Sequence, residues 1–535
     1  MADIWEVAAD VRGEHPAQVH GEQRVSWTTF DRRADGVATW LLDLGVERQD
    51  KVAQYLYNGP EYLQAVFGCF KAGLVPVNTN YRYTDDELAY LWDNADAVAV
   101  TFSGTFTPRI EAVRDRVPVR AWLWVDDGSG PCPPWATPFE EAAGSATERT
   151  AASWGRDGDD LYFIYTGGTT GMPKGVMWRQ DDLVGILGTA AGGTFPAEGD
   201  VEALRTRITE APPGVVLPAA PLMHGTGALA TFSQLLSGAT VVTLTAPSFD
   251  AVELLDAIAR EKVNLIVIVG DAFSRPILDA LDAEPDRWDL SSLVGVVSSG
   301  AMWSRPVKDR LLAHHPNMLL LDSLGSSEAV GMGASISAGT GSETATFALG
   351  ENAVVLTEDG RPVAPGSGEV GRVGVRGRVP VGYYKDPEKS AQTFPVLDGV
   401  RYSMPGDYAT VEADGTLSLL GRGSVCINTG GEKVFPEEVE EVLKTHATVR
   451  DAVAVGVPDE RFGQIIVAVV EPEPSPGGGE IDPAAVIAHV KTKLASFKAP
   501  KQVVVVETIG RAPNGKVDYA RLTTLAAERL AVRPS

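Results

Sequence analysis

Residues 165 to 176 read Tyr165-Thr-Gly-Gly-Thr-Thr-Gly-Met-Pro-Lys-Gly-Val176, and eight of these twelve residues are threonine, glycine or lysine. They follow the apolar run Leu161-Tyr-Phe-Ile164, which predicts a buried strand. Consecutive glycines free several backbone N–H groups to point at one anion, because glycine tolerates φ > 0 and has no Cβ. Threonine hydroxyls and the Lys174 ammonium add donors suited to a polyphosphate. The stretch therefore predicts a phosphate-binding loop.

The spacing differs from that of P-loop nucleotide-binding proteins, which carry Gly-x4-Gly-Lys-Ser/Thr at the start of a helix. Here Pro173 precedes the lysine and disfavours a helix at that point. The stretch therefore does not predict a P-loop. A flexible surface loop is the alternative that the residues alone leave open.

Helix and strand patterns alternate on both sides of this loop. A helix is predicted from Phe30 to Leu44, a strand over 51–56, a helix over 61–72 and a strand over 73–77. Beyond the loop, β-branched runs at 214–217, 238–243, 263–269 and 293–297 predict strands, and 249–261 predicts a helix. This alternation is typical of an α/β fold with mixed, largely parallel sheets.

A domain boundary is predicted after Leu417-Ser-Leu-Leu-Gly-Arg422. The remaining residues contain their own predicted helices, over 436–445 and 483–494, and their own strands, over 451–457 and 464–470. We therefore expect a large N-terminal domain over residues 1–422 and a small α+β domain over residues 423–535.

Composition excludes several classes of protein. A length of 535 residues predicts more than one domain, and 44% hydrophobic with 22% charged residues is ordinary for a globular protein. A net charge of −25 disfavours nucleic acid as a partner. The distant Cys69, Cys132 and Cys426 predict neither disulfides nor a zinc site. An acidic N-terminus and no long apolar run predict a cytoplasmic protein without a transmembrane segment; a homodimer is left open.

Further motifs follow the loop in a fixed order. They are Pro221-Leu-Met-His-Gly225, Ser298-Ser-Gly-Ala-Met302, Leu324-Gly-Ser-Ser-Glu328, Tyr402-Ser-Met-Pro-Gly-Asp407, Gly421-Arg422 and Arg511-Ala-Pro-Asn-Gly-Lys-Val517. With residues 165–176, this ordered set resembles the adenylate-forming superfamily of acyl-CoA synthetases, luciferases and adenylation domains, and most of all bacterial synthetases for fatty acids or steroid side-chain acids. The resemblance implies ATP-dependent formation of an acyl-adenylate, followed by transfer of the acyl group to a thiol.

The resemblance also implies a nucleotide site. Glu328 matches the carboxylate that binds Mg²⁺, a hard cation that prefers oxygen ligands. Leu324 replaces the aromatic residue that usually packs on adenine, and Asp322 offers a polar contact nearby. Asp407 and Arg422 match the ribose site. The implied ATP- and AMP-binding residues are Thr166, Gly167, Gly168, Thr169, Thr170, Lys174, Gly300, Ala301, Met302, Asp322, Leu324, Gly325, Ser326, Ser327, Asp407 and Arg422.

The catalytic residues implied by the resemblance are Lys516, Glu328 and His224. Lys516 follows a Pro-Asn-Gly turn, and a positive charge at its tip can stabilise the charge that develops at the α-phosphate. Members of the superfamily rotate the small domain between the two half-reactions, about a hinge that corresponds to Ser424. The coenzyme A contacts expected after this rotation are Gly430, Gly431, Glu432 and Lys433.

The acyl pocket is expected to contain Trp178, His224, Val269, Gly270 and Asp271, on the pattern of relatives. The small Gly270 predicts an open floor and Trp178 predicts an apolar wall. No basic residue is positioned to hold a second carboxylate. We therefore expect a medium- or long-chain fatty acid, or a bulky apolar steroid side-chain acid, as substrate.

Coenzyme A is the expected thiol, because only 19 residues follow Lys516, too few for a fused carrier-protein domain or a dinucleotide-binding domain. Asn428 stands where luciferases often carry a lysine, which disfavours luciferase chemistry. Two alternatives remain open, an acyl-AMP ligase that serves a separate carrier protein and a non-catalytic nucleotide-binding relative. The joint presence of Lys516, Glu328, Asp407 and Arg422 argues against the second alternative.

Overall fold

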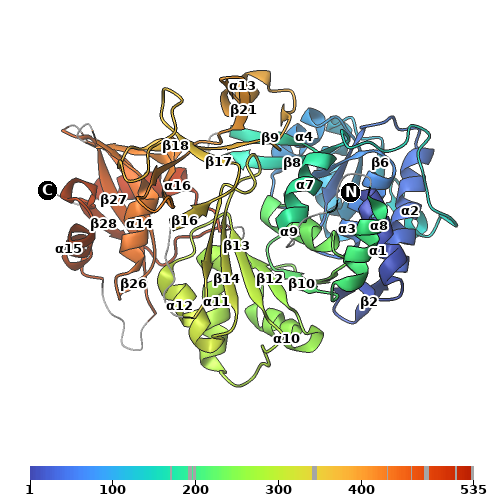
Figure 1. Cartoon of the computed structure of the whole chain (residues 1–535), viewed down its shortest axis with the longest axis horizontal. Helices are drawn as coiled ribbons and strands as arrows, with labels where there is room; N and C mark the ends of the chain where they lie inside the picture. Colours follow the sequence, from blue (N-terminus) through green and yellow to red (C-terminus); the bar gives the residue numbers. More distant parts are fainter. Residues whose placement is uncertain are drawn as a thin grey trace.

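The computed structural model describes residues 1–168, 171–190, 196, 200–339, 346–429, 432–459, 461–474, 481–512 and 515–531. These residues form a large α/β domain built on two extended sheets and a small α+β domain built on a third sheet. The small domain, coloured orange to red, lies at one end of the molecule, opposite helices α1 (Ala2–Arg12) and α2 (Trp27–Asp43) (Figure 1). The structure therefore has the predicted fold class.

The first sheet of the large domain is parallel at one end and antiparallel at the other. Its parallel part has the strand order β1 (Pro16–His20), β11 (Thr240–Thr243), β10 (Val215–Pro218), β12 (Leu265–Ile268), β13 (Gly295–Ser299) and β14 (Leu319–Leu324), with β2 (Gln23–Ser26) antiparallel at the edge. Its antiparallel part continues through β15 (Gly333–Ser337), β16 (Thr346–Leu349), β23 (Leu417–Arg422), β22 (Asp407–Val411) and β18 (Gly371–Arg376) to β21 (Val400–Ser403) and β20 (Val396–Leu397), and β17 (Ala353–Leu356) pairs with β18.

The second sheet contains the glycine-rich stretch. Its strand order is β19 (Gly382–Tyr383), β9 (Gly171–Arg179), β8 (Leu161–Gly168), β4 (Val75–Asn78), β3 (Lys51–Tyr55), β5 (Ala97–Ser103), β6 (Ala121–Val125) and β7 (Thr137–Pro138). The strand predicted over 161–164 extends to Gly168, and β9 returns antiparallel to it. A Cβ on Gly175 would lie 2.7 Å from the Tyr165 ring, so this hairpin needs a glycine there.

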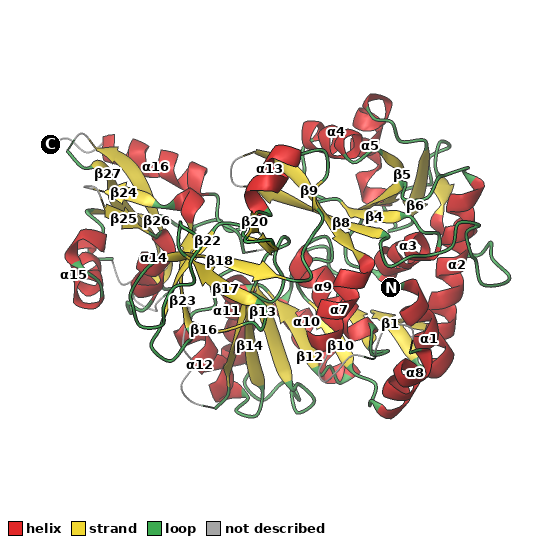
Figure 2. Ribbon diagram, turned by 45° about the horizontal axis from the view of Figure 1, so that its top comes forward, coloured by secondary structure: helices red, strands yellow, loops and turns green. Residues whose placement is uncertain are grey.

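Helices fill the space between the two large sheets and cover their outer faces (Figure 2). Helix α3 (Pro60–Lys71) contacts β3 and β4 of one sheet and β1 of the other. The helix predicted over 249–261 begins two residues later, as α10 (Ala251–Glu261), because the Asp250 carboxylate accepts hydrogen bonds from the backbone N–H groups of Val252 and Glu253. The other helices that bear on the site are α9 (Gly225–Leu235), α11 (Gly270–Ala283) and α12 (Arg305–His314).

The small domain places helices on both faces of its sheet. The sheet contains β24 (Ile427–Thr429), β25 (Glu432–Val434), β26 (Val449–Asp459), β27 (Gly463–Pro472) and β28 (Gln502–Val505). Alternate residues of β26 point to opposite faces, so Ala452 and Ala454 pack with α14 (Pro436–Lys444) and α15 (Pro483–Lys493). Val453 and Val455 pack with α16 (Tyr519–Ala531) on the other face. Within the described ranges, no helix is both long and apolar enough to span a bilayer.

A buried lysine joins the first three helices. The Lys71 ammonium is fully buried and lies 2.7–2.8 Å from carboxylate oxygens of Glu6, Asp31 and Asp35. Burial alone would raise the pKa of Glu6, but hydrogen bonds and charges from Arg156 and Lys71 lower it to about 2. The stabilising contribution of Glu6 is therefore complete above about pH 4.5 and is lost as the pH falls towards 2.

We predict that Lys71→Met destabilises the large domain, because it leaves buried carboxylates without their shared cation. The expected loss is about 3–5 kcal/mol, measured from the urea unfolding curve followed by tryptophan fluorescence. The matched control is Lys262→Met, which breaks an ion pair of similar length, 2.8 Å to Asp289, on the surface. That control should change the stability by less than about 1 kcal/mol. Equal effects of the two substitutions would contradict the prediction.

Candidate active site

Strands β12, β13 and β14 are parallel neighbours, so the segments that follow them emerge at the same edge of the sheet. This edge carries predicted site residues at the end of each strand. They are Val269, Gly270 and Asp271 after β12; Ser298 to Met302 at the end of β13; and Leu324 to Glu328 at the end of β14. The fold therefore brings together three motifs that are far apart in the sequence.

The turn that carries Glu328 is held by a hydroxyl within it and by two distant side chains. The Ser326 hydroxyl accepts hydrogen bonds from the backbone N–H groups of Glu328 and Ala329, both at 3.2 Å. The Trp178 indole N–H donates to the Ser327 carbonyl at 2.8 Å, and the Ser403 hydroxyl donates to the Glu328 carbonyl at 2.6 Å. These bonds fix the direction in which the Glu328 side chain leaves the turn.

Tyr383 connects the Glu328 carboxylate to the glycine-rich hairpin. Its hydroxyl donates to Glu328 Oε1 at 2.9 Å, and the Lys174 ammonium lies 5.6 Å from the centre of its ring. Lys174 also pairs with Asp386 at 3.0 Å. Tyr383 and Asp386 are absent from the predicted site, because their place depends on the pairing of β19 with β9, about 200 residues earlier in the chain.

Asp407 and Arg422 form a pair on two neighbouring strands. They lie opposite each other in the register of β22 and β23, and Arg422 Nε is 3.3 Å from Asp407 Oδ1. The charge of Asp407 raises the pKa of Arg422. The second oxygen of Asp407, Oδ2, is buried and has no hydrogen-bond partner among the described residues. It is thus an acceptor suited to a donor from a bound molecule.

Lys516 reaches this edge from the small domain. Gly515, with φ of +71°, lies so close to the large domain that a Cβ on it would be 2.9 Å from Val269 Cγ1 and 3.1 Å from Ala301 Cβ. Burial lowers the pKa of Lys516 and the charge of Arg422 lowers it further, whereas the charge of Glu328 opposes both effects. The ammonium therefore lies within electrostatic reach of two predicted site residues of the large domain.

His224 immediately precedes helix α9 and lies in the same region. Burial lowers the pKa of His224 to about 3, and the nearby charges of Lys516 and Arg82 contribute to this shift. The imidazole is therefore neutral at pH 7, and at that pH it can serve as a polar wall or hydrogen-bond partner but not as a cation.

Three predicted residues have neighbours that the sequence did not predict. Asp322 is buried against the ammonium of Lys308, 3.0 Å away, so its carboxylate already has a cationic partner. Gly270 does not provide an open floor, because a Cβ there would lie 2.2 Å from the Met302 carbonyl oxygen. Trp178 is fully buried, and its indole is used to hold the Glu328 turn.

The remaining predicted residues are placed as follows. Thr166 and the glycines at 167 and 168 end strand β8, Gly300 has φ of +90°, and Leu324 and Gly325 end β14 and begin the Glu328 turn. Asp271 accepts from the Ser304 backbone N–H at 2.9 Å and pairs with Arg275 at 3.2 Å. Glu432 begins β25. Thr169, Thr170, Gly430, Gly431 and the side chains of Ser424 and Lys433 lie outside the described residues.

The predicted hinge is closely packed. Residues Gly423–Val425 form one turn of 3-10 helix between β23 and β24. A Cβ on Gly421, whose φ is +121°, would lie 2.0 Å from Glu437 Oε2, and one on Gly423 would lie 2.5 Å from the Tyr408 ring. Both positions therefore require glycine, and Glu437 of helix α14 brings the small domain against the last strand of the large one.

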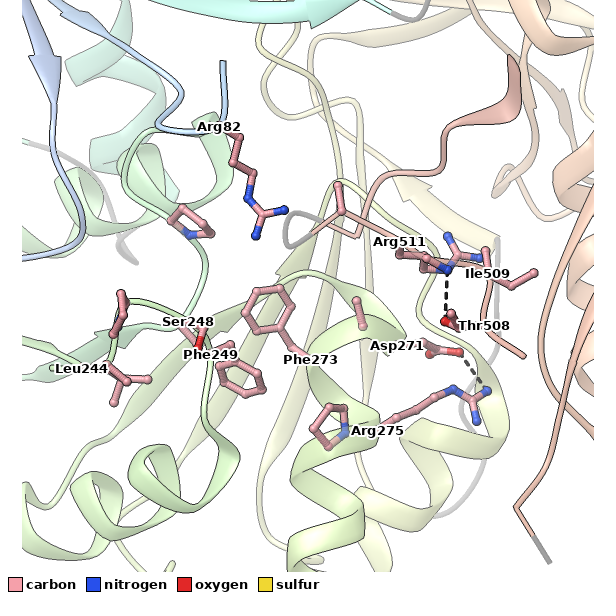
Figure 3. Close-up of a pocket in the computed structure, with 18 of the residues that line it drawn as sticks. Arg82, Leu244, Ser248, Phe249, Asp271, Phe273, Arg275, Thr508, Ile509 and Arg511 are labelled. Carbon is pink, nitrogen blue, oxygen red and sulfur yellow. Dashed lines mark hydrogen bonds and ion pairs between the residues drawn. The ribbon is translucent and has the colours of Figure 1, made fainter. Parts of the chain in front are cut away.

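A cavity of about 470 Å³ opens between the two domains beside this site. Figure 3 shows its apolar wall, formed by Leu244, Phe249 and Phe273, with Arg82 pointing towards it from above. Loop residues of the small domain, from Thr508 to Ala512, close one side of the cavity. The volume is within the range of small-molecule pockets. Arg275 and Arg511 on its lining are paired with Asp271 and Asp451, and Arg82 brings a further positive charge to its edge.

Relatives of known activity and structure share this arrangement of domains. The sequence matches the family model described as "AMP-binding enzyme" over residues 5–384, and the model described as "AMP-binding enzyme C-terminal domain" over residues 438–516. It is 42% identical to a medium/long-chain-fatty-acid–CoA/3-oxocholest-4-en-26-oate–CoA ligase of Mycolicibacterium smegmatis, over 99% of this chain and 97% of the relative. It is 41% identical to a 3-oxocholest-4-en-26-oate–CoA ligase of Rhodococcus rhodochrous, over 97% and 94% of the two chains.

Solved structures share the fold over nearly the whole chain. An anthranilate CoA ligase in complex with anthranoyl-AMP superposes with a TM-score of 0.82 at 22% identity, covering 99% of this chain and 98% of the other. ATP-bound MatB from Rhodopseudomonas palustris gives a TM-score of 0.80 at 24% identity, with 99% of each chain covered. The predicted superfamily and fold class are therefore confirmed, and the chain belongs to the AMP-binding enzyme family of adenylate-forming enzymes.

Proposed function

We propose that this enzyme is an ATP-dependent acyl-CoA synthetase, which forms an acyl-adenylate and then transfers the acyl group to coenzyme A. The observation that carries the proposal is the position of Lys516. A loop of the small domain packs Gly515 against Val269 and Ala301, and the next residue, Lys516, is buried where the charges of Arg422 and Glu328 act on it. From this position, a residue of the small domain would act in the adenylation step.

The residues of the site fit a magnesium–ATP complex. The unpaired Asp407 Oδ2 can accept from a ribose hydroxyl, and Lys174 on the hairpin can meet the β- and γ-phosphates. Glu328, held by Tyr383, is the oxygen ligand that would hold Mg²⁺. The metal ion would supply neutralisation of the phosphate charge.

In the first half-reaction, a carboxylate oxygen of the acid attacks the α-phosphorus and pyrophosphate leaves. The ammonium of Lys516 stabilises the negative charge between the two reacting groups, in a buried setting where each charge acts strongly. The neutral His224 adds no positive charge that would compete with Lys516 for the bound carboxylate.

In the second half-reaction, the thiol attacks the acyl carbonyl and AMP leaves. Lys516 is not needed for this step, so we propose that the small domain turns about Gly423–Val425 between the two steps. The thiol would enter through the cavity between the domains. Residues 508–512 form part of its wall, and rotation of the small domain would move them and widen the cavity.

The acid is proposed to be a medium- or long-chain fatty acid or a steroid side-chain acid. Two curated relatives with these substrates in their names cover almost the whole chain at 41–42% identity. The apolar wall of Leu244, Phe249 and Phe273 agrees with such a substrate or with the apolar part of the thiol arm.

A panel of acids tests this proposal directly. Medium- and long-chain fatty acids and steroid side-chain acids should release pyrophosphate with ATP and give thioesters with coenzyme A, whereas acetate should give neither at a comparable rate. Accumulation of adenylate without thioester would instead indicate delivery to a carrier protein. Absence of pyrophosphate with every acid would indicate a nucleotide-binding protein without this activity.

We predict that Lys516→Ala lowers the rate of adenylation by about 100-fold or more, because it removes the charge aimed at the α-phosphate. Thioester formation from a preformed acyl-adenylate should change by less than about twofold. Pyrophosphate release and single-turnover thioester formation measure the two steps. Lys501→Ala, on an exposed residue of the same domain, is the control and should leave both rates unchanged. Equal loss of both steps would refute this division of roles.

We predict that Asp407→Ala removes the preference for a ribose hydroxyl. The wild-type enzyme should use ATP about tenfold or more better than 2'-deoxy-ATP or 3'-deoxy-ATP in kcat/KM, because a hydrogen bond to a buried carboxylate is strong. The variant should use ATP poorly and should no longer distinguish it from the analogue that lacks the bonded hydroxyl. A variant that retains the full wild-type preference would show that Asp407 does not bind the sugar.

A further inference from the structure

The loop that carries Lys516 is closed by its own backbone. The Gly515 N–H donates to the Ala512 carbonyl at 2.7 Å, and the Ala512 N–H donates to the Lys516 carbonyl at 2.9 Å. Gly515 has a positive φ of +71° that few other residues adopt. The backbone on either side of Lys516 therefore has a defined shape, but these bonds do not tie the loop to the rest of the small domain.

Arg511 supplies that tie. Its Nε donates to Asp451 Oδ2 at 2.6 Å and one terminal nitrogen donates to Asp451 Oδ1 at 2.9 Å, a two-point pairing that fixes the plane of the guanidinium. The other terminal nitrogen donates to the Gly515 carbonyl at 3.2 Å. One side chain thus connects strand β26 to the residue that precedes Lys516.

Burial makes this connection stiff. The side chains of Arg511 and Asp451 are only 16% and 13% exposed. Burial alone would raise the pKa of Asp451, but Lys444 and Arg511 hold it below its ordinary value, so the carboxylate stays charged. A buried, charged, two-point pair has few alternative geometries, because any other arrangement leaves a charge without its partner.

The same carboxylate is connected to the large domain. Lys444, at the end of α14, lies 3.3 Å from Asp451 Oδ1, and its ammonium is 3.9 Å from the Met302 sulfur. Met302 belongs to the segment after β13 that also contains Ala301, against which Gly515 packs. We call Lys444, Asp451 and Arg511 the Asp451 cluster; it touches both the loop and the surface on which the loop rests.

We propose that the Asp451 cluster, through Arg511, positions Lys516 for the adenylation step. The inference rests on the proposed role of Lys516 and adds to it the residues that act through that lysine. A displacement of about 1 Å in a reacting geometry can cost about 100-fold in rate. The hydrogen bond from Arg511 to the Gly515 carbonyl would prevent a displacement of this size at Lys516, because Gly515 is the preceding residue.

Arg511→Lys tests the proposal. A lysine keeps the charge beside Asp451 but cannot hold the carboxylate at two points and reach the Gly515 carbonyl at once. Pyrophosphate release should fall about tenfold or more in kcat, with a much smaller change in the KM for ATP. Thioester formation from preformed acyl-adenylate should remain as in the wild type. Arg461→Lys, an exposed arginine of the same domain that stacks on Phe462, is the matched control and should leave both steps unchanged.

A second variant separates positioning from folding. If Arg511 acts through Lys516, then Arg511→Lys in the Lys516→Ala background should cause no further loss of adenylation. A further loss of the same factor, or an equal loss of both half-reactions in the single variant, would overturn the proposal. If Arg511→Lys fails to fold, Asp451→Asn serves for the same comparison, with the melting temperature as the measure of folding.

The proposed function and this inference fail in different ways. If Lys516→Ala leaves adenylation intact, the role of the lysine itself is wrong. If Lys516→Ala abolishes adenylation while Arg511→Lys and Asp451→Asn do not slow it, then only the positioning role is wrong.

Discussion

The contact of Gly515 with Val269 and Ala301 is the constraint on which the candidate active site depends. It is the place where a loop of one domain meets the carboxyl ends of two parallel strands in the other. Only a residue without a Cβ allows the backbone to come so near, and this approach carries the next residue, Lys516, among the charges of Arg422 and Glu328. The sheet and helices of the small domain hold this short loop against the large domain.

Buried charges with defined partners recur through the molecule. Lys71 among three carboxylates holds the first helices together, Lys308 with Asp322 supports the strand before the Glu328 turn, and Asp451 with two cations supports the Lys516 loop. In each case the low dielectric makes a mispaired arrangement costly, so these pairs restrict geometry more than they add net stability. Asp407 differs, because one of its oxygens is left without a protein partner in the described part of the chain. This oxygen is therefore available to a donor from a bound molecule, as the proposed contact with a ribose hydroxyl requires.

The sequence was sufficient for the class of fold, for the superfamily and for the strands and helices with a clear periodicity, such as α3, α10 and β27. These features follow from local periodicity and from motifs in a fixed order. It was not sufficient for residues whose role depends on distant pairing. Tyr383 reaches Glu328 because β19 pairs with the edge strand β9, and no local sequence pattern around Tyr383 predicts this pairing. The neighbours of Asp322 and Gly270 were not predicted for a related reason. Asp322 is paired with the buried Lys308, fourteen residues earlier in the chain. The Met302 carbonyl oxygen occupies the space that a Cβ on residue 270 would need.

The alternation along β26 has a consequence for motion. Since the two faces of the small sheet are covered by α14 and α15 on one side and by α16 on the other, the small domain holds two apolar cores within itself. A change in the orientation of such a domain would leave both cores buried and would alter only the contacts at its border, among them those of Gly515 with Val269 and of Arg450 with Asp279. Because both faces of its sheet are covered, the small domain depends on the large domain for its position and not for its folding core.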